Sequence, residues 1–166
     1  YEGADALMLS GETSIGKHPI KCVQYLRDIS LNAERSETLH FENNLKHESD
    51  WHTLAATSVK LARKIDADAI VVLTRSGFTA ELISSARPRV PVFAFTNNRA
   101  TQNKLSISSS IENIYLNFSK DHEKTINNAF QVLKNAYRFK SKNKLIVISG
   151  VFSDIFADAI QIRFLK

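Results

Sequence analysis

The chain contains one stretch that decides its fold, Ala69-Ile70-Val71-Val72-Leu73 (AIVVL). This unbroken apolar run is rich in β-branched residues, which is typical of a strand buried on both faces of a sheet. Three more apolar runs predict three more strands, the middle one weaker than the others: Val92–Phe95, Ile114–Leu116 and Leu145–Ile148. Strands of this kind need helices on both sides of the sheet to exclude water.

Between these runs the apolar residues follow a helical period. The clearest helix has apolar residues at i, i+3, i+4, i+7 and i+11, which are Ile126, Ala129, Phe130, Leu133 and Tyr137. A second stripe precedes AIVVL and consists of Leu54, Ala55, Ser58, Leu61, Ala62 and Ile65. Short helices are predicted around 82–86, ending before Pro88, and over 99–106. The alternation predicts an α/β/α sandwich of three layers with a mainly parallel sheet of about five strands.

The fifth strand is predicted near the end of the chain, where Ile160, Ile162 and Phe164 alternate with polar residues. A period of two indicates an edge strand with one face in water. The connection that precedes it is too short for a crossover helix. We therefore expect this last strand to run antiparallel to its predecessor.

The first 50 residues follow a different pattern. Ala4–Leu9 predicts a short buried strand, and Pro19 fits the first turn of a helix. The apolar face of that helix continues from Cys22 to Ala33, whereas 34–50 is polar and charged. The sequence thus predicts three parts: a strand and a helix over 1–33, a connection over 34–50, and an α/β domain over 51–166.

Composition excludes several classes of protein. The 166 residues suffice for one domain plus a piece of another, and 43% are hydrophobic, as in ordinary globular proteins. A single cysteine, Cys22, excludes a disulfide scaffold and a zinc cage of several cysteines, and the five histidines show no metal spacing. No apolar run reaches the about 18–20 residues of a membrane span, so no membrane partner is predicted. The chain begins at Tyr1 and soon enters an apolar run, which suggests a cut inside a longer protein.

Charge is spread unevenly along the chain. The net charge is +5, with 5 basic and 9 acidic residues over 1–50 (−4) and 17 basic and 8 acidic residues over 51–166 (+9). A basic half is compatible with a phosphate ligand, a nucleic acid or an acidic protein. The densest basic stretch, 138–144, is expected to be a solvated loop, because Phe139 is its only aromatic residue. We therefore predict no nucleic-acid partner.

Gly11–Lys17 has the spacing of a phosphate-binding P-loop and lies between the predicted first strand and helix. The motif then requires serine or threonine, but His18 follows, and Glu12 adds negative charge to the loop. A glycine-permitted turn into a helix is the simpler interpretation.

Thr74–Thr79 is the second candidate phosphate loop, because it connects the AIVVL strand to a helix. Ligands bind open α/β sheets at the carboxyl ends of strands, and a helix N-terminus favours anions. Thr74, Ser76 and Thr79 offer hydroxyl groups, Arg75 a cation, and Gly77 close backbone approach. The alternative, which the pattern leaves open, is a capped turn in which the hydroxyls only satisfy the helix.

These two loops, in this order, resemble pyruvate kinase. Gly3–Thr13 (GADALMLSGET) resembles the eighth strand and following loop of that family's (β/α)8 catalytic barrel, and Gly16–Pro19 resembles the start of the last barrel helix. Ala69–Gly77 (AIVVLTRSG) resembles the opening of the family's C-terminal domain. Further matches in that domain are Thr79-Ala80, Ser84, Arg87-Pro88 and Pro91. On this resemblance, 1–33 is the end of the barrel and 51–166 the regulatory and assembly domain.

The family resemblance implies an activity and its partners. Pyruvate kinase transfers a phosphoryl group from phosphoenolpyruvate to ADP in glycolysis, with magnesium and potassium, as a cytoplasmic homotetramer. Its C-terminal domain often binds a phosphorylated small-molecule effector. The resemblance places that effector's phosphate on the matching residues Thr74, Arg75, Ser76, Gly77 and Thr79. Ser10 and Glu12 match positions at the active-site end of the barrel, where a supporting role is implied.

The sequence also departs from the family pattern. Phe78 stands where regulated members often have a basic or hydroxyl residue, and the loop Gly150–Asp158 carries two aspartates and no glycine after Gly150. Acidic groups weaken phosphate binding by repulsion. The phosphoryl-transfer lysine and the metal ligands of the family come from earlier barrel strands. We therefore expect this chain alone to hold no metal ion and to be inactive as a kinase.

Two other functions remain open at this stage. The first is a stand-alone α/β domain that binds a phosphorylated metabolite or a protein and catalyses nothing. The second, less favoured, is a basic nucleic-acid-binding module, which would show salt-dependent binding. Without barrel neighbours, the predicted strand Ala4–Leu9 is also expected to pair with another chain, to dock elsewhere or to be poorly ordered.

Overall fold

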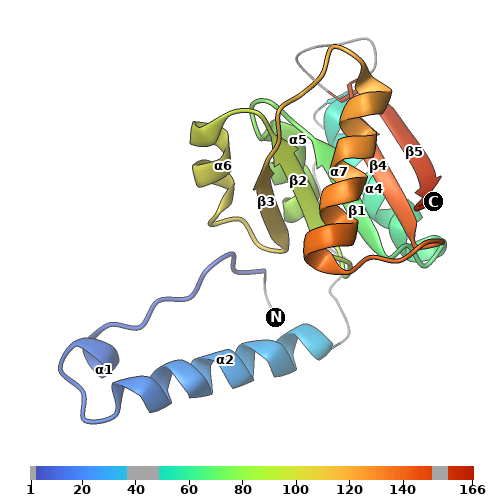
Figure 1. The fold of residues 1–166 in the computed structure, drawn as a ribbon. Coiled ribbons are helices and arrows are strands. Elements are labelled where there is room, and N and C mark those ends of the chain that lie inside the picture. The colour runs from blue at the N-terminus through green and yellow to red at the C-terminus, as the bar shows by residue number, and fades with distance from the viewer. Residues whose placement is uncertain (1–2, 37–48, 151–156) are drawn as a thin grey trace.

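A five-stranded sheet forms the centre of the fold (Figure 1). The computed structural model describes residues 3–36, 49–150 and 157–166. The strand order is β3-β2-β1-β4-β5, and every neighbouring pair is parallel except β4 and β5, which are antiparallel. The strands are β1 (Ala69–Leu73), β2 (Val92–Thr96), β3 (Ile111–Tyr115), β4 (Lys144–Ser149) and β5 (Ala159–Phe164).

Helices connect the strands. Strand β1 leads through α5 to β2, β2 through α6 to β3, and β3 through α7 to β4. The helices of this domain are α4 (Asp50–Lys64), α5 (Phe78–Ser85), α6 (Arg99–Leu105) and α7 (His122–Tyr137). Two more helices, α1 (Gly11–Ser14) and α2 (Pro19–Arg35), precede the domain.

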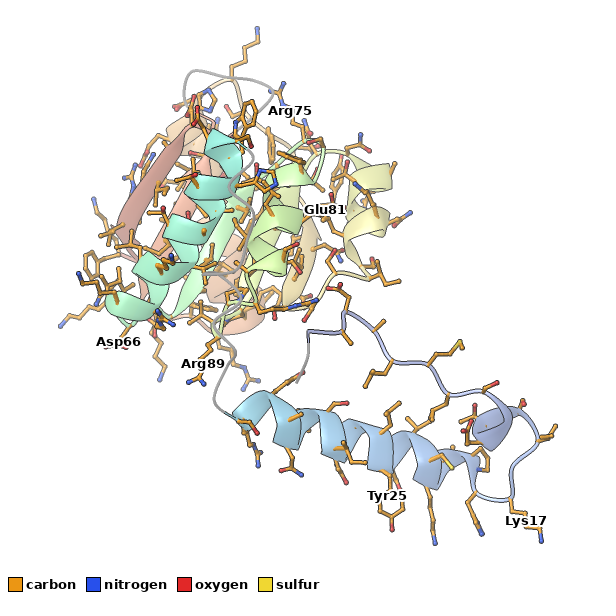
Figure 2. All side chains as sticks on the ribbon, turned by 180° about the vertical axis from the view of Figure 1, so that it is seen from behind. Lys17, Tyr25, Asp66, Arg75, Glu81 and Arg89 are labelled. Atoms are coloured by element: carbon orange, nitrogen blue, oxygen red, sulfur yellow. The ribbon has the colours of Figure 1, made fainter. Side chains whose placement is uncertain are left out.

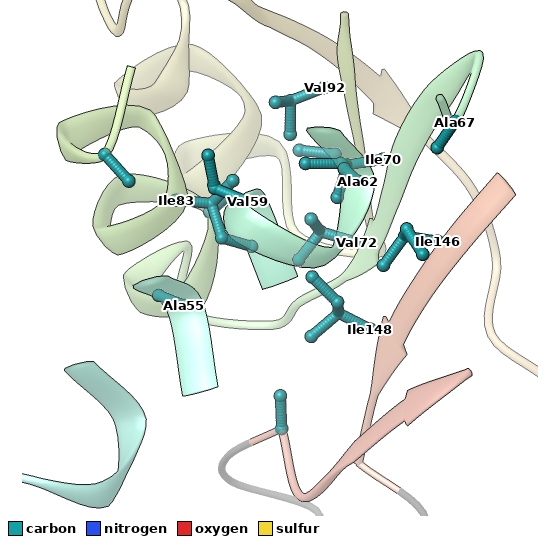
Figure 3. Packing of buried hydrophobic residues seen from close by; sticks show 14 of the residues in the cluster. Ala55, Val59, Ala62, Ala67, Ile70, Val72, Ile83, Val92, Ile146 and Ile148 are labelled. Carbon is teal, nitrogen blue, oxygen red and sulfur yellow. The ribbon is translucent and has the colours of Figure 1, made fainter. Parts of the chain in front are cut away.

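The central strand β1 is buried on both faces, and its side chains alternate between two apolar cores. Ile70 and Val72 join a cluster with α4 and α5, which Figure 3 shows from close by. Ala69 and Val71 point to the opposite face, where the apolar stripe of α7 covers them. The three-layer α/β/α sandwich predicted from the sequence is therefore confirmed.

The predicted bounds of β1 are confirmed, whereas the predicted bounds of β3 differ from those in the structure. The third strand starts at Ile111 rather than Ile114, because it pairs with β2 from Val92 onward. The apolar run 114–116 marks only its end. The polar residues Glu112 and Asn113 hid its start from a hydrophobicity pattern.

The edge strand β5 has the predicted direction, but its more exposed side is the apolar one. Ile162 is 48% exposed and Phe164 56% exposed. On the other side of the strand, Arg163 lies against α7, where its guanidinium binds both carboxylate oxygens of Glu123 at 3.1 and 2.8 Å. The polar positions Gln161 and Arg163 are thus half-buried, whereas Ile162 and Phe164 are exposed and only Ile160 of the apolar positions packs against the core.

The prediction of a strand at Ala4–Leu9 is wrong for this chain. The segment has no strand conformation, and most of its residues are exposed. A strand needs a neighbour for its backbone N–H and C=O groups, and the segment forms no strand pair within the described part of the chain. The predicted connection over 34–50 lies mostly outside the described residues.

Helix α2 forms as predicted, with Pro19 in its first turn, yet it buries no residue. Several large apolar side chains on it are exposed: Ile20, Val23, Tyr25, Ile29 and Leu31. Figure 1 shows α1 and α2 beside the sandwich rather than within its layers. None of the helices in the described part of the chain has the length and apolar character of a membrane span.

Candidate functional site

The order of the strands makes the carboxyl ends of β1 and β4 a candidate ligand site. From β1 the chain moves through α5 to β2 on one side, whereas β4 lies on the other side of β1 and is reached through α7. The chain connections therefore diverge between β1 and β4, and open α/β sheets bind ligands at the carboxyl ends of such a strand pair. Thr74–Thr79 follows β1 at this edge, and Ser149 ends β4 beside it.

The hydroxyl groups of the β1–α5 loop hold the loop itself. The Thr74 hydroxyl accepts the Gly77 N–H at 3.0 Å, and the Ser76 hydroxyl accepts the Phe78 N–H at 3.4 Å. Thr79 is 5% exposed and faces inward. The Thr74 and Ser76 hydroxyls thus hold the turn, whereas Gly77 at the N-cap of α5 receives no side-chain cap, and the exposed Ser76 hydroxyl remains within reach of a ligand.

Gly77 and helix α6 determine the shape of this loop. Gly77 has a φ of +87°, a conformation that favours glycine, and it precedes the first residue of α5. A Cβ atom there would lie 3.2 Å from the Thr101 methyl group. The Thr101 hydroxyl donates to the Arg75 carbonyl oxygen at 2.8 Å, so a side chain of α6 holds the backbone of the loop.

Phe78 borders the loop on the α4 side. Phe78 is half-buried and meets the His52 ring edge-on, with the ring centroids 6.5 Å apart. Arg75 is exposed, and Figure 2 shows it at the end of the domain that lies away from α2. The predicted loop residues Thr74, Arg75, Ser76, Gly77 and Thr79 thus share one edge of the sheet, and a role in binding phosphate stays a prediction.

Ser149, which the sequence analysis did not single out, lies at the same carboxyl end of the sheet as the Thr74–Thr79 loop. Its side chain is 1% exposed, and its hydroxyl has no hydrogen-bond partner among the described residues. A buried hydroxyl without a partner costs free energy. The signal was available in the sequence, because Ser149 follows the apolar run of β4 as Thr74 follows that of β1. Of the loop Gly150–Asp158, residues 151–156 lie outside the described residues, and the Asp158 N–H donates to the Ser149 carbonyl oxygen at 3.1 Å.

Ser10 and Glu12 lie elsewhere. Ser10 precedes α1 and Glu12 lies in its first turn, and both are exposed. The Glu12 carboxylate accepts its own backbone N–H and that of Ser10, and these bonds lower its pKa. Gly16 packs against this turn, where a Cβ atom would lie 2.3 Å from the Glu12 carbonyl oxygen. The near P-loop is thus a tight helical turn, and the structure does not bring it to the Thr74–Thr79 loop (Figure 1).

A second polar cluster, also missed from the sequence, joins the N-terminal segment to the domain. The Arg87 guanidinium donates to the Asp5 carboxylate at 2.8 Å and also to the Gly3 carbonyl oxygen. The same carboxylate oxygen accepts the Ser109 N–H at 3.0 Å. Arg87 first, and then the Ser109 N–H, hold the pKa of Asp5 below its ordinary value. We call Asp5, Arg87 and Ser109 the joint.

A family model confirms the interpretation of the sandwich. Residues 52–162 match the model described as "Pyruvate kinase, alpha/beta domain". The chain belongs to the pyruvate kinase family. The matched region includes strands β1 to β4, the first four residues of β5, the Thr74–Thr79 loop and the two domain residues of the joint.

Known pyruvate kinases resemble this chain over nearly its full length. A chloroplastic pyruvate kinase isozyme A of Nicotiana tabacum is 32% identical over 160 residues, which are 91% of this chain and 27% of that protein. A pyruvate kinase of Thermoplasma acidophilum is 30% identical, over 90% of this chain and 27% of that protein. The crystal structure of a pyruvate kinase from Cryptosporidium parvum matches with a TM-score of 0.85 and 26% identity, over 99% of this chain and 34% of that one. The chain thus spans about a quarter to a third of these relatives.

The conformation of Gly77 yields a first prediction. Gly77→Ala should lower the free energy of unfolding by about 1–2 kcal/mol, because an L-residue is strained at this φ and its Cβ atom crowds Thr101. Gly11→Ala is the matched control, since a Cβ atom there meets nothing within 4 Å. Urea unfolding followed by the fluorescence of the single tryptophan, Trp51, measures both variants. Equal stabilities of the two variants would contradict the strained geometry.

Proposed function

We propose that this chain is the C-terminal part of a pyruvate kinase that transfers a phosphoryl group from phosphoenolpyruvate to ADP. The observation that carries the proposal is the match of residues 52–162 to the family's α/β domain, in a chain that spans about a quarter to a third of its relatives. Within this enzyme the sandwich serves effector binding and assembly. We also propose that this reaction is a step of glycolysis and that Ser10 and Glu12 have supporting roles at the active-site end of the barrel.

Residues 3–36 expose apolar surface, and this supports the proposal that another part of the parent enzyme packs against them. Helix α2 exposes large apolar side chains, and a hollow of about 860 Å³ lies between this helix, the segment 3–7 and the turn 87–89. Leu7, Val23 and Leu26 line the hollow. Exposed apolar surface of this extent is typical of an interface. We propose that the rest of a catalytic barrel covers it in the parent enzyme.

A phosphorylated small molecule is the proposed effector, and it would bind at the carboxyl ends of β1 and β4. The loop offers the N-terminus of α5, the exposed Ser76 hydroxyl and the Arg75 cation, and Ser149 is buried beside it. Helix N-termini and cations attract phosphate oxygens. The hydroxyl groups that hold the loop leave fewer donors for a ligand. We therefore expect modest affinity.

A second copy of the chain is the proposed partner for β5. The strand lies at the outer edge of the sheet, and Ile162 and Phe164 on it are about half exposed. An open edge with apolar side chains favours association. Burial of this edge between copies supports the homo-oligomer, a tetramer, that the family resemblance implies.

The magnesium and potassium of the parent enzyme are proposed to bind outside this chain. Within residues 3–36, 49–150 and 157–166, no three His, Cys, Asp or Glu side chains come together as a metal site. We propose that the metal ions of the parent enzyme are held by the part of the barrel outside this sequence.

The cytoplasmic location also remains a proposal. Some of the relatives are named as chloroplastic, so the comparisons leave the compartment open.

The alternative function, a stand-alone binding domain, differs from the main proposal in one observable way. The gene of a pyruvate kinase would encode a barrel upstream, with its phosphoryl-transfer lysine and acidic metal site.

The absence of a complete active site predicts the outcome of a kinase assay. The purified 166-residue chain, supplied with phosphoenolpyruvate, ADP, magnesium and potassium, should form no pyruvate above the rate without protein. Positioned cations and metal ions supply the stabilisation that phosphoryl transfer needs, and no cluster of three His, Cys, Asp or Glu side chains forms among the residues that the structure describes. A full-length pyruvate kinase is the positive control. Pyruvate formation that rises with chain concentration would overturn this prediction.

The loop geometry predicts which side chain controls effector binding. Isothermal titration with sugar phosphates and nucleotides should detect a ligand whose affinity falls about five- to tenfold in Ser76→Ala, the value of one lost hydrogen bond of about 1–1.4 kcal/mol. Ser85→Ala is the matched control, because Ser85 is an exposed serine at the other end of α5. Equal losses in both variants would remove Ser76 from the site. Binding of none of the ligands would leave the domain with an assembly role only.

A further inference from the structure

The sheet has two outer strands, β3 and β5, and their free edges differ. An outer strand presents a row of unpaired backbone N–H and C=O groups, which can pair with a strand of another molecule. Strand β5 carries the exposed apolar side chains Ile162 and Phe164. Among the residues that the structure describes, no side chain bonds to the backbone of β5. The free edge of β5 is therefore open.

The bonds between β3 and β2 show which groups of β3 face its free edge. The Val92 N–H donates to the Ser110 carbonyl oxygen, and the Leu116 N–H donates to the Thr96 carbonyl oxygen. Along a strand, the N–H and C=O groups of successive residues point alternately to one side and the other. The even-numbered residues of β3 therefore face β2. The odd-numbered residues 111, 113 and 115 present their N–H and C=O groups to the free edge.

Helix α6 brings three polar side chains to this edge. Arg99 and Gln102 lie in the helix, and Ser106 is its C-cap residue. Their spacing of i, i+3 and i+7 places them on one face of the helix. Figure 1 shows α6 on the outer side of β3, away from the other strands. We call Arg99, Gln102 and Ser106 the guard.

Each residue of the guard contacts an outward-facing residue of β3. The Gln102 side-chain amide donates to the Asn113 carbonyl oxygen at 3.4 Å. The Asn113 side-chain amide in turn donates to the Ser106 hydroxyl at 3.3 Å. The Arg99 guanidinium lies over the Tyr115 ring, 3.9 Å from the ring centroid. A strand that paired with β3 would have to displace these contacts.

Further contacts hold the guard in place and keep charge at the edge. The Arg99 guanidinium donates to the Gln102 side-chain oxygen at 3.0 Å, so the two side chains fix each other. On the opposite face of β3, the exposed Glu112 carboxylate accepts the Tyr137 hydroxyl at 2.8 Å. Burial, and then this carboxylate, raises the pKa of Tyr137 to about 12, so the hydroxyl remains a donor at neutral pH. Charged groups beside an outer strand oppose pairing, because a partner strand would take them out of water.

We propose that the guard closes the free edge of β3 to strand pairing, so that a second copy of the chain can extend the sheet only at β5. Two copies that meet through the same strand do so about a two-fold axis, and the contact uses up that edge in both. A sheet with one open edge therefore forms closed pairs, whereas a sheet with two open edges can grow without limit. Whether β5 pairs rests on the proposed function, whereas the closure of β3 does not.

The test removes the guard from the whole 166-residue chain. Arg99→Ala combined with Gln102→Ala deletes the two side chains that bond each other over β3, and alanine preserves the helix. Asn103→Ala combined with Lys104→Ala is the matched control, because it also deletes one amide and one cation from α6. Both control positions are exposed, and Lys104 pairs with Glu81 rather than with β3. Light scattering measures the mass against chain concentration, and amide hydrogen exchange reports on β3.

Without the guard, the mass should rise with chain concentration to at least double that of the control, and the amides of 111–115 should exchange more slowly as it rises. Equal masses of the variant and the control would overturn the proposal. A larger mass with unchanged exchange over 111–115 would overturn it too, because the chains would then associate elsewhere. If circular dichroism shows that the double variant does not fold, Gln102→Ala is compared with Asn103→Ala for the same outcomes.

Phe164→Lys separates this proposal from the pairing of β5, because a lysine on an outer strand opposes pairing. If Phe164→Lys leaves the mass of the chain unchanged while removal of the guard raises it, the pairing of β5 fails and the guard is supported. If Phe164→Lys lowers the mass while removal of the guard has no more effect than the control, the pairing of β5 is supported and the guard is overturned. If both hold, Phe164→Lys should stop the growth of the unguarded chain at pairs.

Discussion

Burial of β1 on both faces is the constraint on which the rest of the structure depends. Ala69, Ile70, Val71 and Val72 are all 0% exposed. Each buried Val or Ile side chain contributes about 1.5–3 kcal/mol relative to exposure, but only if both sides of the strand are covered. The helices α4 and α5 cover one face and α7 covers the other. A three-layer sandwich follows from this requirement.

The same strand places the candidate site. Because β1 is central and the chain connections diverge on its two sides, the carboxyl ends of β1 and β4 form the open end of the sheet. The Thr74–Thr79 loop leaves β1 at that point, and Ser149 lies at the end of β4. Helices α5 and α6 then lead away from this edge to Arg87 and Ser109. The position of β1 in the sheet thus determines where the core, the candidate site and the joint lie.

The sequence predicted the core well and the polar contacts poorly, for physical reasons. Hydrophobic period is a local signal, so β1 and the helix around Leu133 could be placed from it. The start of β3 depends on pairing with β2, and Ala4–Leu9 depends on strand neighbours that the described residues do not supply. The pairing of Asp5 with Arg87 joins residues 82 positions apart, which no local pattern encodes. Likewise, the sequence showed hydroxyl groups near Gly77 but not whether they bind the loop or a ligand.

Phosphate binding between β1 and β4 is the central functional claim, and an NMR titration of the chain with inorganic phosphate tests it most directly. We expect the amide signals of Ser76, Gly77 and Ser149 to shift most and to saturate together. We also expect little change at the basic loop 138–144, which attracts anions only through its charge. Largest shifts at 138–144, or no saturable shift at Ser76, Gly77 and Ser149, would contradict a phosphate site at this edge of the sheet.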